Sequence, residues 1–249
     1  MTEKNVKLEA GNLLTLFLCG DVMTGRGIDQ VLPHPNPPHL MEPFMTSALQ
    51  YVDIAERANG PIAKPVAFPY IWGEALAELD RVRPDLRIVN LETAVTTSED
   101  CQPKGINYRM HPKNISCLNA AGIDCCLLGN NHVLDWGRAG LLETLASLEA
   151  AGIKTAGAGR DLKQAEEPAI LEVPGKGRVI VYSFGDVSSG VPRSWAASAD
   201  RPGVNLLSDL SERTAVRIAG QVKRVKRSGD VAVASIHWGG NWGYEIPPR

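Results

Sequence analysis

Short apolar segments alternate with amphipathic segments along this 249-residue chain, and this alternation is the strongest constraint on its fold. The apolar segments have the length of β-strands, and the segments between them repeat their apolar residues with a helical period. Alternating strands and helices are typical of an α/β protein with helices packed outside a sheet. We predict strands over residues 13–19, 86–91, 123–128, 178–184 and 231–236, and helices over 70–82, 114–121, 140–151 and 207–226, the last capped by Ser208 or Asp209.

Two regions interrupt this alternation. Residues 33–38 are rich in proline, which excludes a helix interior or a central strand there. We predict that residues 30–69 form an insertion or flap with one helix over 45–57, and that residues 186–202 form a loop. No internal repeat or interdomain linker is evident, and one α/β domain can reach this length. We therefore predict a single domain over residues 1–249.

Charge, hydropathy and cysteine content exclude several classes of protein. The 26 basic and 28 acidic side chains give a net charge of −2, so a dedicated nucleic-acid binder is not expected. No apolar run approaches the roughly 18 residues of a membrane span. The number of cysteines is odd, and Cys125 and Cys126 are adjacent, which is poor disulfide geometry. We expect reduced thiols in a cytoplasmic protein.

Carboxylate, amide and imidazole side chains follow four of the predicted strands. Ligands of open α/β sheets bind beyond the carboxyl ends of strands, so these side chains can meet in one crevice. Their oxygen and nitrogen donors suit divalent ions such as Mn²⁺, Fe²⁺, Zn²⁺ or Mg²⁺. The residues are Asp21, Asn90, Glu92, Asn130, Asn131, His132 and His237.

Each of these residues also has an ordinary structural explanation. Asp21 can cap a turn, and Asn131 can occupy a left-handed turn position. Glu92 can be a solvated carboxylate, and His237 can be a histidine of the core or the surface. Their occurrence together, each at the end of a strand, favours one shared site.

Three other motifs are incomplete or have simpler explanations. Residues 20–27 begin like a phosphate-binding loop but have Arg26 and Gly27 in place of its lysine and hydroxyl residue. Residues 157–162 lack the third glycine of a dinucleotide-binding loop. The basic run at 223–227 suits the C-terminus of a solvated helix. None of the three supports a nucleotide or nucleic-acid site.

Four sequence blocks occur in a characteristic order: Gly-Asp-Val-Met at 20–23, Asn-Leu-Glu at 90–92, Asn-Asn-His at 130–132 with Asp-Trp-Gly at 135–137, and His-Trp-Gly at 237–239. Together they resemble the CapA family of bacterial poly-γ-glutamate capsule synthesis proteins, and the resemblance runs from about residue 13 to the C-terminus. That family is similar to calcineurin-like metallophosphoesterases. The resemblance implies a calcineurin-like α/β fold, with a central β-sandwich flanked by helices, and a two-metal site.

The resemblance also implies roles for individual residues. Asp21 would bind the first metal, Glu92 would bridge the two metals, and Asn131 and His237 would bind the second. His132 would be the general acid at the leaving group. Two such metals can hold a bridging hydroxide and stabilise an in-line displacement at phosphorus.

Arginine side chains next to the blocks suit an anionic substrate. We predict a catalytic role for Arg26 and substrate-binding roles for Arg109, Arg138 and Asn90. The substrate class is a small molecule or an anionic polymer, and the oligomeric state stays open.

The chain departs from the wider phosphoesterase pattern in two places. Met23 stands where many members have a histidine, and no histidine follows His237, where the family continues to a Gly-His-x-x-His block. Residues 245–247 resemble the start of the next family segment. We therefore expect a C-terminally truncated chain with an incomplete metal site.

Two functions fit these observations. The first is a metal-dependent hydrolase of phosphoester-type bonds that is linked to poly-γ-glutamate synthesis. The second is a non-catalytic accessory or polymer-binding component of poly-γ-glutamate synthesis or export. The chemistry of the predicted site favours the first, and the name of the resembled family favours the second.

Overall fold

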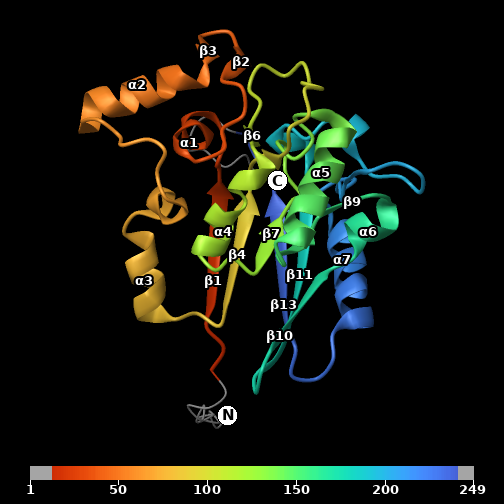
Figure 1. The fold of residues 1–249 in the computed structure, drawn as a ribbon. Helices are drawn as coiled ribbons and strands as arrows, with labels where there is room; N and C mark the ends of the chain where they lie inside the picture. The colour runs from red at the N-terminus through yellow and green to blue at the C-terminus, as the bar shows by residue number, and fades with distance from the viewer. Residues whose placement is uncertain (1–12, 241–249) are drawn as a thin grey trace.

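Two β-sheets form the centre of the protein in the computed structural model, which describes residues 13–240 (Figure 1). The first sheet is parallel, in the order β1-β4-β7-β8. In the second, in the order β10-β11-β13, β10 is antiparallel to β11 and β13 is parallel to it. The predicted α/β class is confirmed. The strands are β1 (Leu16–Val22), β4 (Leu86–Leu91), β7 (Cys125–Leu127), β8 (Lys154–Ala156), β10 (Ala169–Val173), β11 (Gly177–Gly185) and β13 (Val231–His237).

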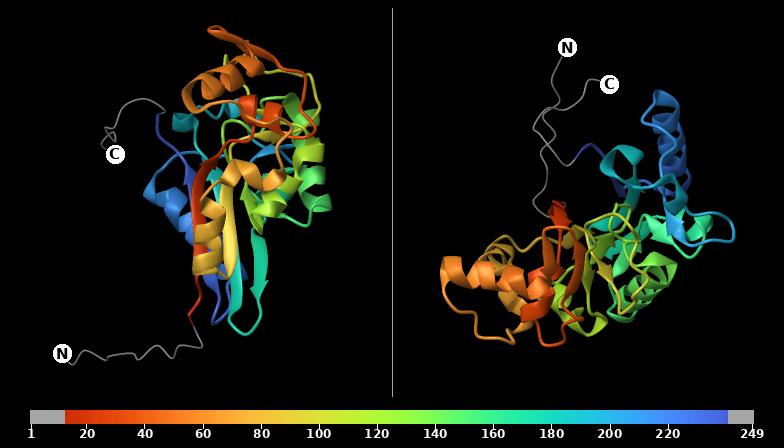
Figure 2. Two further views of the ribbon diagram at one scale, coloured as in Figure 1. Left: turned by 60° about the vertical axis from the view of Figure 1, so that its left-hand side comes forward. Right: turned by 90° about the horizontal axis from the view of Figure 1, so that it is seen from above.

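Apolar side chains fill the space between the two sheets. Ile88 and Leu127 of the first sheet belong to one buried cluster with Leu171 and Val181 of the second. A second cluster joins the other face of the first sheet to helices α1, α2, α4 and α5, and a third joins the second sheet to α7 (Figure 2). The helices are α1 (Arg26–Val31), α2 (Ala48–Asn59), α3 (Ala75–Val82), α4 (Ser116–Ala120), α5 (Gly137–Ala150), α6 (Leu162–Glu166) and α7 (Glu212–Val225).

Shorter elements complete the fold. The region 30–69, predicted as an insertion, contains α2 at the place of the predicted helix and also a hairpin of β2 and β3 that the sequence analysis did not predict. The short strands are β2 (His39–Glu42), β3 (Met45–Ser47), β5 (Ala94–Val95), β6 (Arg109–Met110), β9 (Ala158–Gly159) and β12 (Gly203–Val204). The 3-10 helices are η2 (Phe68–Trp72), η3 (Pro112–Asn114), η4 (Val187–Ser189) and η5 (Arg193–Trp195).

Two predicted helices differ from the observed ones. The helix predicted over 70–82 is divided into η2 and α3 by Gly73, whose φ of 50° interrupts the helical path. The predicted caps of α7 are wrong, because Ser211 caps it and its side chain accepts a hydrogen bond from the main-chain nitrogen of Thr214. Asp209 supports this turn by accepting a hydrogen bond from the Thr214 hydroxyl at 2.6 Å.

Strand β10 was missed, although its sequence alternates with the period of a strand. Ala169, Leu171 and Val173 are buried, while Ile170 and Glu172 face outward. This alternation places one face of β10 in the core between the sheets. The strand is only five residues long, and the outward-facing Glu172 breaks up the apolar pattern in the sequence.

Three further expectations concern the chain as a whole. The predicted truncation falls at residues 241–249, which lie outside the described residues. Between residues 13 and 240, no helix is both long and apolar enough to cross a bilayer. All five cysteines are free thiols, and the cytoplasmic location stays a prediction.

The main chain at Gly157, at the carboxyl end of the first sheet, lies in close contact with the Ser183 side chain of the second sheet. A side chain at Gly157, which follows β8, would approach the nitrogen of Gly129 to 2.7 Å and the Cβ of Ser183 in β11 to 2.7 Å. Gly157 also has a φ of 95°, which L side chains rarely adopt. The absence of a side chain at this position therefore allows the two sheet edges to meet.

We expect Gly157→Ala to lower the free energy of unfolding by about 2–5 kcal/mol, because it combines left-handed strain with overpacking. Gly152→Ala is the matched control, since Gly152 has a φ of 75° but open space around its Cα. The control should cost only about 1–2 kcal/mol. Urea denaturation of both variants measures the difference, and equal losses would contradict the tight contact.

Candidate metal centre

Strands β1 and β4 bring Asp21 and Glu92 to the same edge of the first sheet. Gly20 is an extra residue in the β1–β4 register, and Asp21 therefore pairs with Asn90. A bulge of this kind redirects the side chains that follow it. The main-chain nitrogen of Glu92 donates to the carbonyl oxygen of Val22 at 2.9 Å, which continues the pairing past the end of β4.

His237 reaches this edge from the second sheet, as the last residue of β13. Its carbonyl oxygen accepts hydrogen bonds at 3.0 Å from the main-chain nitrogen of Asp186 and from the hydroxyl of Ser189. Its imidazole Nε2 lies 3.4 Å from Oε1 of Glu92, and Nδ1 lies 3.8 Å from Oδ1 of Asp21. Three strand ends thus contribute to one cluster.

One amide group holds the two carboxyl groups of this cluster together. Nδ2 of Asn90 donates to Asp21 at 2.7 Å and to Glu92 at 2.6 Å. Its Oδ1 accepts from Nδ2 of Asn130 at 3.0 Å, and this contact sets the orientation of the amide. Asn90, predicted to bind substrate, therefore supports the candidate metal ligands in this structure.

Asn131 joins the cluster from the loop after β7. Its Oδ1 lies 3.0 Å from Nε2 of His237. The preceding Asn130 shapes this loop by accepting hydrogen bonds from the main-chain nitrogens of His132 and Val133. The structure thus brings together all four residues predicted as metal ligands: Asp21, Glu92, Asn131 and His237.

The donor set of the cluster fits a divalent cation. Donor atoms of Asp21, Glu92 and His237 all lie within 4.8 Å of one another. Carboxylate oxygens and an imidazole are donors that Mn²⁺, Fe²⁺ and Zn²⁺ accept. A bound cation would also compensate the negative charge that two neighbouring carboxylates place at a partly buried position.

Burial shifts the pKa of two members of the cluster. Burial raises the pKa of the Glu92 carboxyl to about 8, and the negative charge of Asp21 adds to the rise. Burial lowers the pKa of His237, against the opposing charge of Asp21. A bound cation would favour the charged form of Glu92 and the neutral form of His237, and these are the forms in which both groups can act as ligands.

His132, predicted to be the general acid, is buried next to the cluster and is held by Asp135. Its Nδ1 lies 2.6 Å from Oδ2 of Asp135. We therefore place a proton on Nδ1, which donates it to this carboxyl oxygen. Nε2 makes no hydrogen bond to any residue in the range 13–240. Burial lowers the pKa of His132, while the bond to Asp135 opposes this shift. The imidazole is therefore oriented, with one nitrogen available to a bound molecule.

Two residues that the sequence analysis did not assign to the site complete the surroundings of His132. Lys104 donates from Nζ to Asp135 at 2.8 Å and also to the carbonyl oxygen of Asn131. The ring of Tyr108 stacks on His132 with centroids 4.0 Å apart. Lys104 lies in the long loop between β5 and β6, away from the ends of the predicted strands, so the strand-end pattern did not include it.

Arg26 also contacts the ring of Tyr108. Its guanidinium carbon is 4.7 Å from the centroid of the Tyr108 ring and 4.8 Å from that of Tyr51. Its Nε pairs with Oε1 of the buried Glu42 at 2.6 Å. Arg26 is thus connected to His132 through one aromatic ring.

The other two predicted arginines are used elsewhere. Arg109 packs over Trp136, with its guanidinium carbon 3.9 Å from the ring centroid, and donates to the carbonyl oxygen of Ser98. Arg138 donates to the carbonyl oxygens of Ser194 and Pro202. Both guanidinium groups bind main-chain carbonyls of loops, and the structure does not bring them into the cluster.

Comparison with known proteins gives the chain its family. Residues 15–249 match the family of bacterial capsule synthesis proteins PGA_cap. The chain belongs to this family. A PGA_cap relative from Mycobacterium tuberculosis, named "probable polyglutamine synthesis accessory protein", is 49% identical over 243 residues, which are 96% of this chain and 64% of the relative.

More distant relatives carry the CapA name. The PGA biosynthesis protein CapA of Bacillus subtilis is 23% identical over 94% of this chain, and the capsule biosynthesis protein CapA of Bacillus anthracis is 24% identical over 98%. The matched part is 51% of each of these two proteins. The resemblance to CapA is confirmed, and the chain spans between half and two thirds of these PGA_cap relatives.

The pKa of Glu92 predicts how stability depends on pH without metal. The ordinary pKa of a glutamate is 4.5, and that of Glu92 in the folded protein is about 8. At pH values between these two, the folded protein holds the Glu92 proton more tightly than the unfolded chain does. The free energy of unfolding should therefore fall by a few kcal/mol as pH rises through this range. Glu92→Gln should remove the part of this fall that comes from Glu92. Urea denaturation at a series of pH values, with a chelator present, measures it.

Glu74→Gln, at an exposed glutamate of the segment before α3, is the control and should keep the wild-type pH dependence. If the Glu92→Gln and wild-type proteins lose stability in parallel from pH 5 to 8, the burial of Glu92 does not have the energetic effect described.

Proposed function

We propose that this domain is a divalent-metal-dependent hydrolase of phosphoester-type bonds that acts in the synthesis of a polyglutamate capsule polymer. The observation that supports it most is the meeting of Asp21, Glu92 and His237 at the ends of three strands, within 4.8 Å. Asn131, beside His237, adds a fourth ligand to this centre. When bound there, the metal would activate water and neutralise charge on a phosphoryl oxygen.

The chain's own residues supply the remaining steps. Asp135 holds Nδ1 of His132, so that Nε2 can give a proton to the leaving oxygen. Lys104 holds the Asp135 carboxyl group in place through its bond at 2.8 Å. Arg26 has a guanidinium group held between two aromatic rings, and such a group suits the binding of a phosphate oxygen.

The role in capsule synthesis comes from the relatives. One relative is named as an accessory protein of polyglutamine synthesis, and two are named for PGA or capsule biosynthesis. Because this chain spans only part of these proteins, the link between the metal centre and the polymer belongs to this proposal. A hydrolytic step on a phosphorylated intermediate or end group is compatible with an accessory role.

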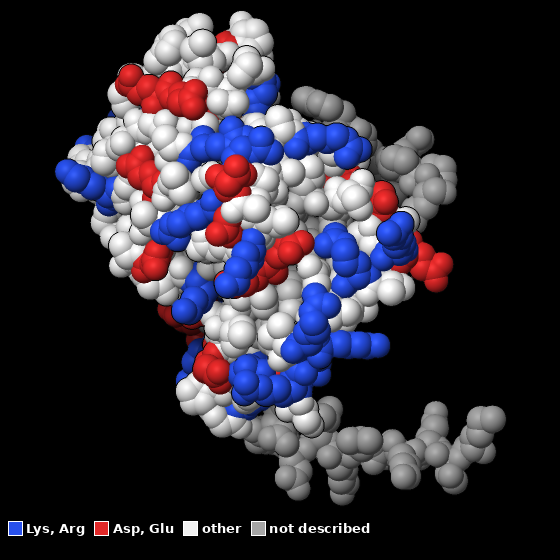
Figure 3. Space-filling model, turned by 90° about the vertical axis from the view of Figure 1, so that its right-hand side faces the viewer, with Lys and Arg blue, Asp and Glu red and all other residues white. Residues whose placement is uncertain are grey.

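A non-catalytic polymer-binding role is the second candidate. The side of the molecule that carries α6 and α7 displays many Lys and Arg side chains among fewer acidic ones (Figure 3). Lys223 and Arg224 lie in the last turn of α7. A polyanion would be attracted to such a face by charge alone, and its binding would weaken with added salt. This candidate does not require the metal centre.

Metal content tests the proposed centre. After loading with Mn²⁺ or Zn²⁺ and desalting, the wild-type protein should retain metal in elemental analysis. Asp21→Ala and His237→Ala should each weaken metal affinity by about tenfold or more. Asp53→Ala, at an exposed aspartate of α2, should behave like the wild type. Equal metal content in all four proteins would exclude this centre.

Substitution of His132 tests the proposed proton donor. We expect His132→Gln to lower kcat for both bis(4-nitrophenyl) phosphate and phenyl phosphate. The loss should be smaller for the nitrophenyl ester, because nitrophenolate leaves without protonation. For the poorer leaving group, the loss in kcat should be about 10²–10⁴-fold with metal content unchanged. Equal losses for both esters would contradict a general-acid role. If the metal-loaded wild type hydrolyses neither ester, the polymer-binding candidate is favoured.

A further inference from the structure

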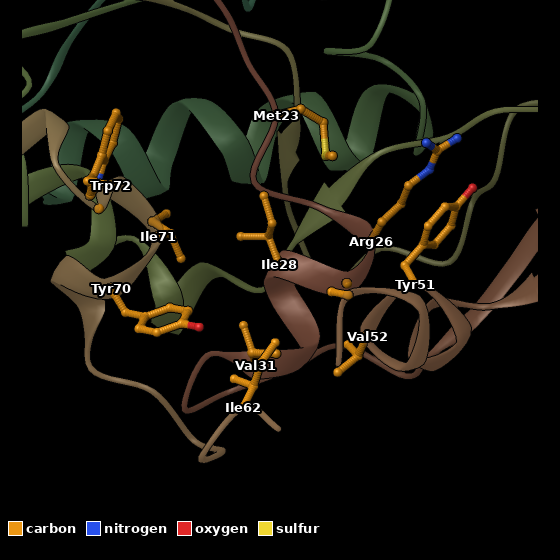
Figure 4. Close-up of a pocket in the computed structure, with 13 residues that line it drawn as sticks. Met23, Arg26, Ile28, Val31, Tyr51, Val52, Ile62, Tyr70, Ile71 and Trp72 are labelled. Carbon is orange, nitrogen blue, oxygen red and sulfur yellow. The ribbon is translucent and has the colours of Figure 1, made fainter. Parts of the chain in front are cut away.

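An apolar cleft of about 660 Å³ lies beside the candidate metal centre, between α1, α2 and η2 (Figure 4). Ile28 and Val31 of α1 line it on one side and Val52 of α2 on another, while Tyr70 and Trp72 of η2 form an aromatic wall. The cleft belongs to no function assigned above. Its volume is in the range of sites that bind small organic molecules.

Arg26 is the one charged residue that lines this cleft among residues 13–240. The bond to Glu42 uses Nε, and the two terminal nitrogens of Arg26 have no hydrogen-bond partner in that range. The rings of Tyr51 and Tyr108 flank its guanidinium group. A guanidinium group stacked in this way presents its free edge to an anion.

The backbone at Arg26 is also unusual. Its φ of 51° lies in the left-handed region, which a side chain of this kind rarely adopts. Such strain is found most often where a side chain must be aimed for function. The strain and the free nitrogens are two independent observations on the same residue.

The cleft and the metal centre are connected through short contacts. Met23, which lines the cleft, is two residues beyond Asp21 in the chain. Arg26 contacts Tyr108, and Tyr108 stacks on His132. A molecule whose anionic group lies near Arg26 and the metal centre can therefore place an attached apolar group between α1 and η2.

We propose that the cleft binds the hydrocarbon or aromatic part of an amphiphilic phosphoester whose phosphoryl group lies at Arg26 and the metal centre. This inference rests on the proposed function for the position of the phosphoryl group, and on the cleft itself for the apolar group. A segment of a polyanionic polymer does not suit the cleft, because its carboxylates would lose hydration against aliphatic side chains.

Binding of n-alkyl phosphates to chelator-treated protein tests the cleft without any metal. By calorimetry, affinity should rise about three- to fourfold for each methylene from butyl to octyl phosphate, because each methylene leaves water for the cleft. Affinity that does not depend on chain length would overturn the proposal.

Two matched substitutions in α2 locate the binding. Ala55 lines the cleft, so Ala55→Trp should fill it and lower octyl phosphate affinity at least tenfold. Ala58 is exposed on the same helix and does not line the cleft, so Ala58→Trp should bind like the wild type. Equal affinity in both variants would overturn the proposal. Should Ala55→Trp fail to fold, Tyr70→Ala, at a half-exposed ring of the cleft wall, replaces it and should lower the affinity severalfold.

Two further measurements separate this proposal from the proposed function. Asp21→Ala, which should lose metal, should keep the dependence of binding on chain length. If affinity for alkyl phosphates depends on chain length but no ester is hydrolysed, the cleft proposal is supported and the hydrolase proposal is contradicted. Hydrolysis of short and long alkyl esters with the same KM would support the hydrolase and overturn the cleft.

Discussion

The meeting of two carboxyl groups at a partly buried position is the constraint on which the candidate site depends. Asp21 and Glu92 share one amide, that of Asn90, and lie beside His237. Burial removes hydration from the Glu92 carboxyl, and the exposed carboxylate of Asp21 repels a negative charge on it. The arrangement therefore favours either a proton on Glu92 or a cation. The surrounding hydrogen bonds, from Asn130 to Asn90 and from Ser189 to His237, hold the groups in this arrangement.

The close packing of the two sheets makes this meeting possible. Asp21 and Glu92 come from the first sheet and His237 from the second, so their distances depend on how the carboxyl ends of the sheets approach. The tight contact at Gly157 lies at that approach. The centre is therefore a property of the whole layered fold, although few residues form it.

The sequence predicted the main features of the fold because they follow from local periodicity. The strand at 86–91 has a continuous pattern and was predicted with its observed bounds. The helix predicted over 140–151 was found with small errors at its ends, since it spans Gly137–Ala150. The cluster of candidate ligands was found because carboxyl ends of strands gather at one edge. Lys104 was missed because its position follows from tertiary contacts. The hairpin of β2 and β3 was missed because its strands are only four and three residues long. The use of Arg109 and Arg138 in binding loop carbonyls was likewise invisible in the sequence.

Anomalous diffraction from crystals grown with Mn²⁺ tests the central claim most directly. The claim is that strand ends of both sheets together build one cation site. The account predicts an anomalous peak within bonding distance of Asp21, Glu92 and His237. A fully Mn²⁺-equilibrated crystal with no peak there, or with its strongest peak at another group of residues, would contradict it.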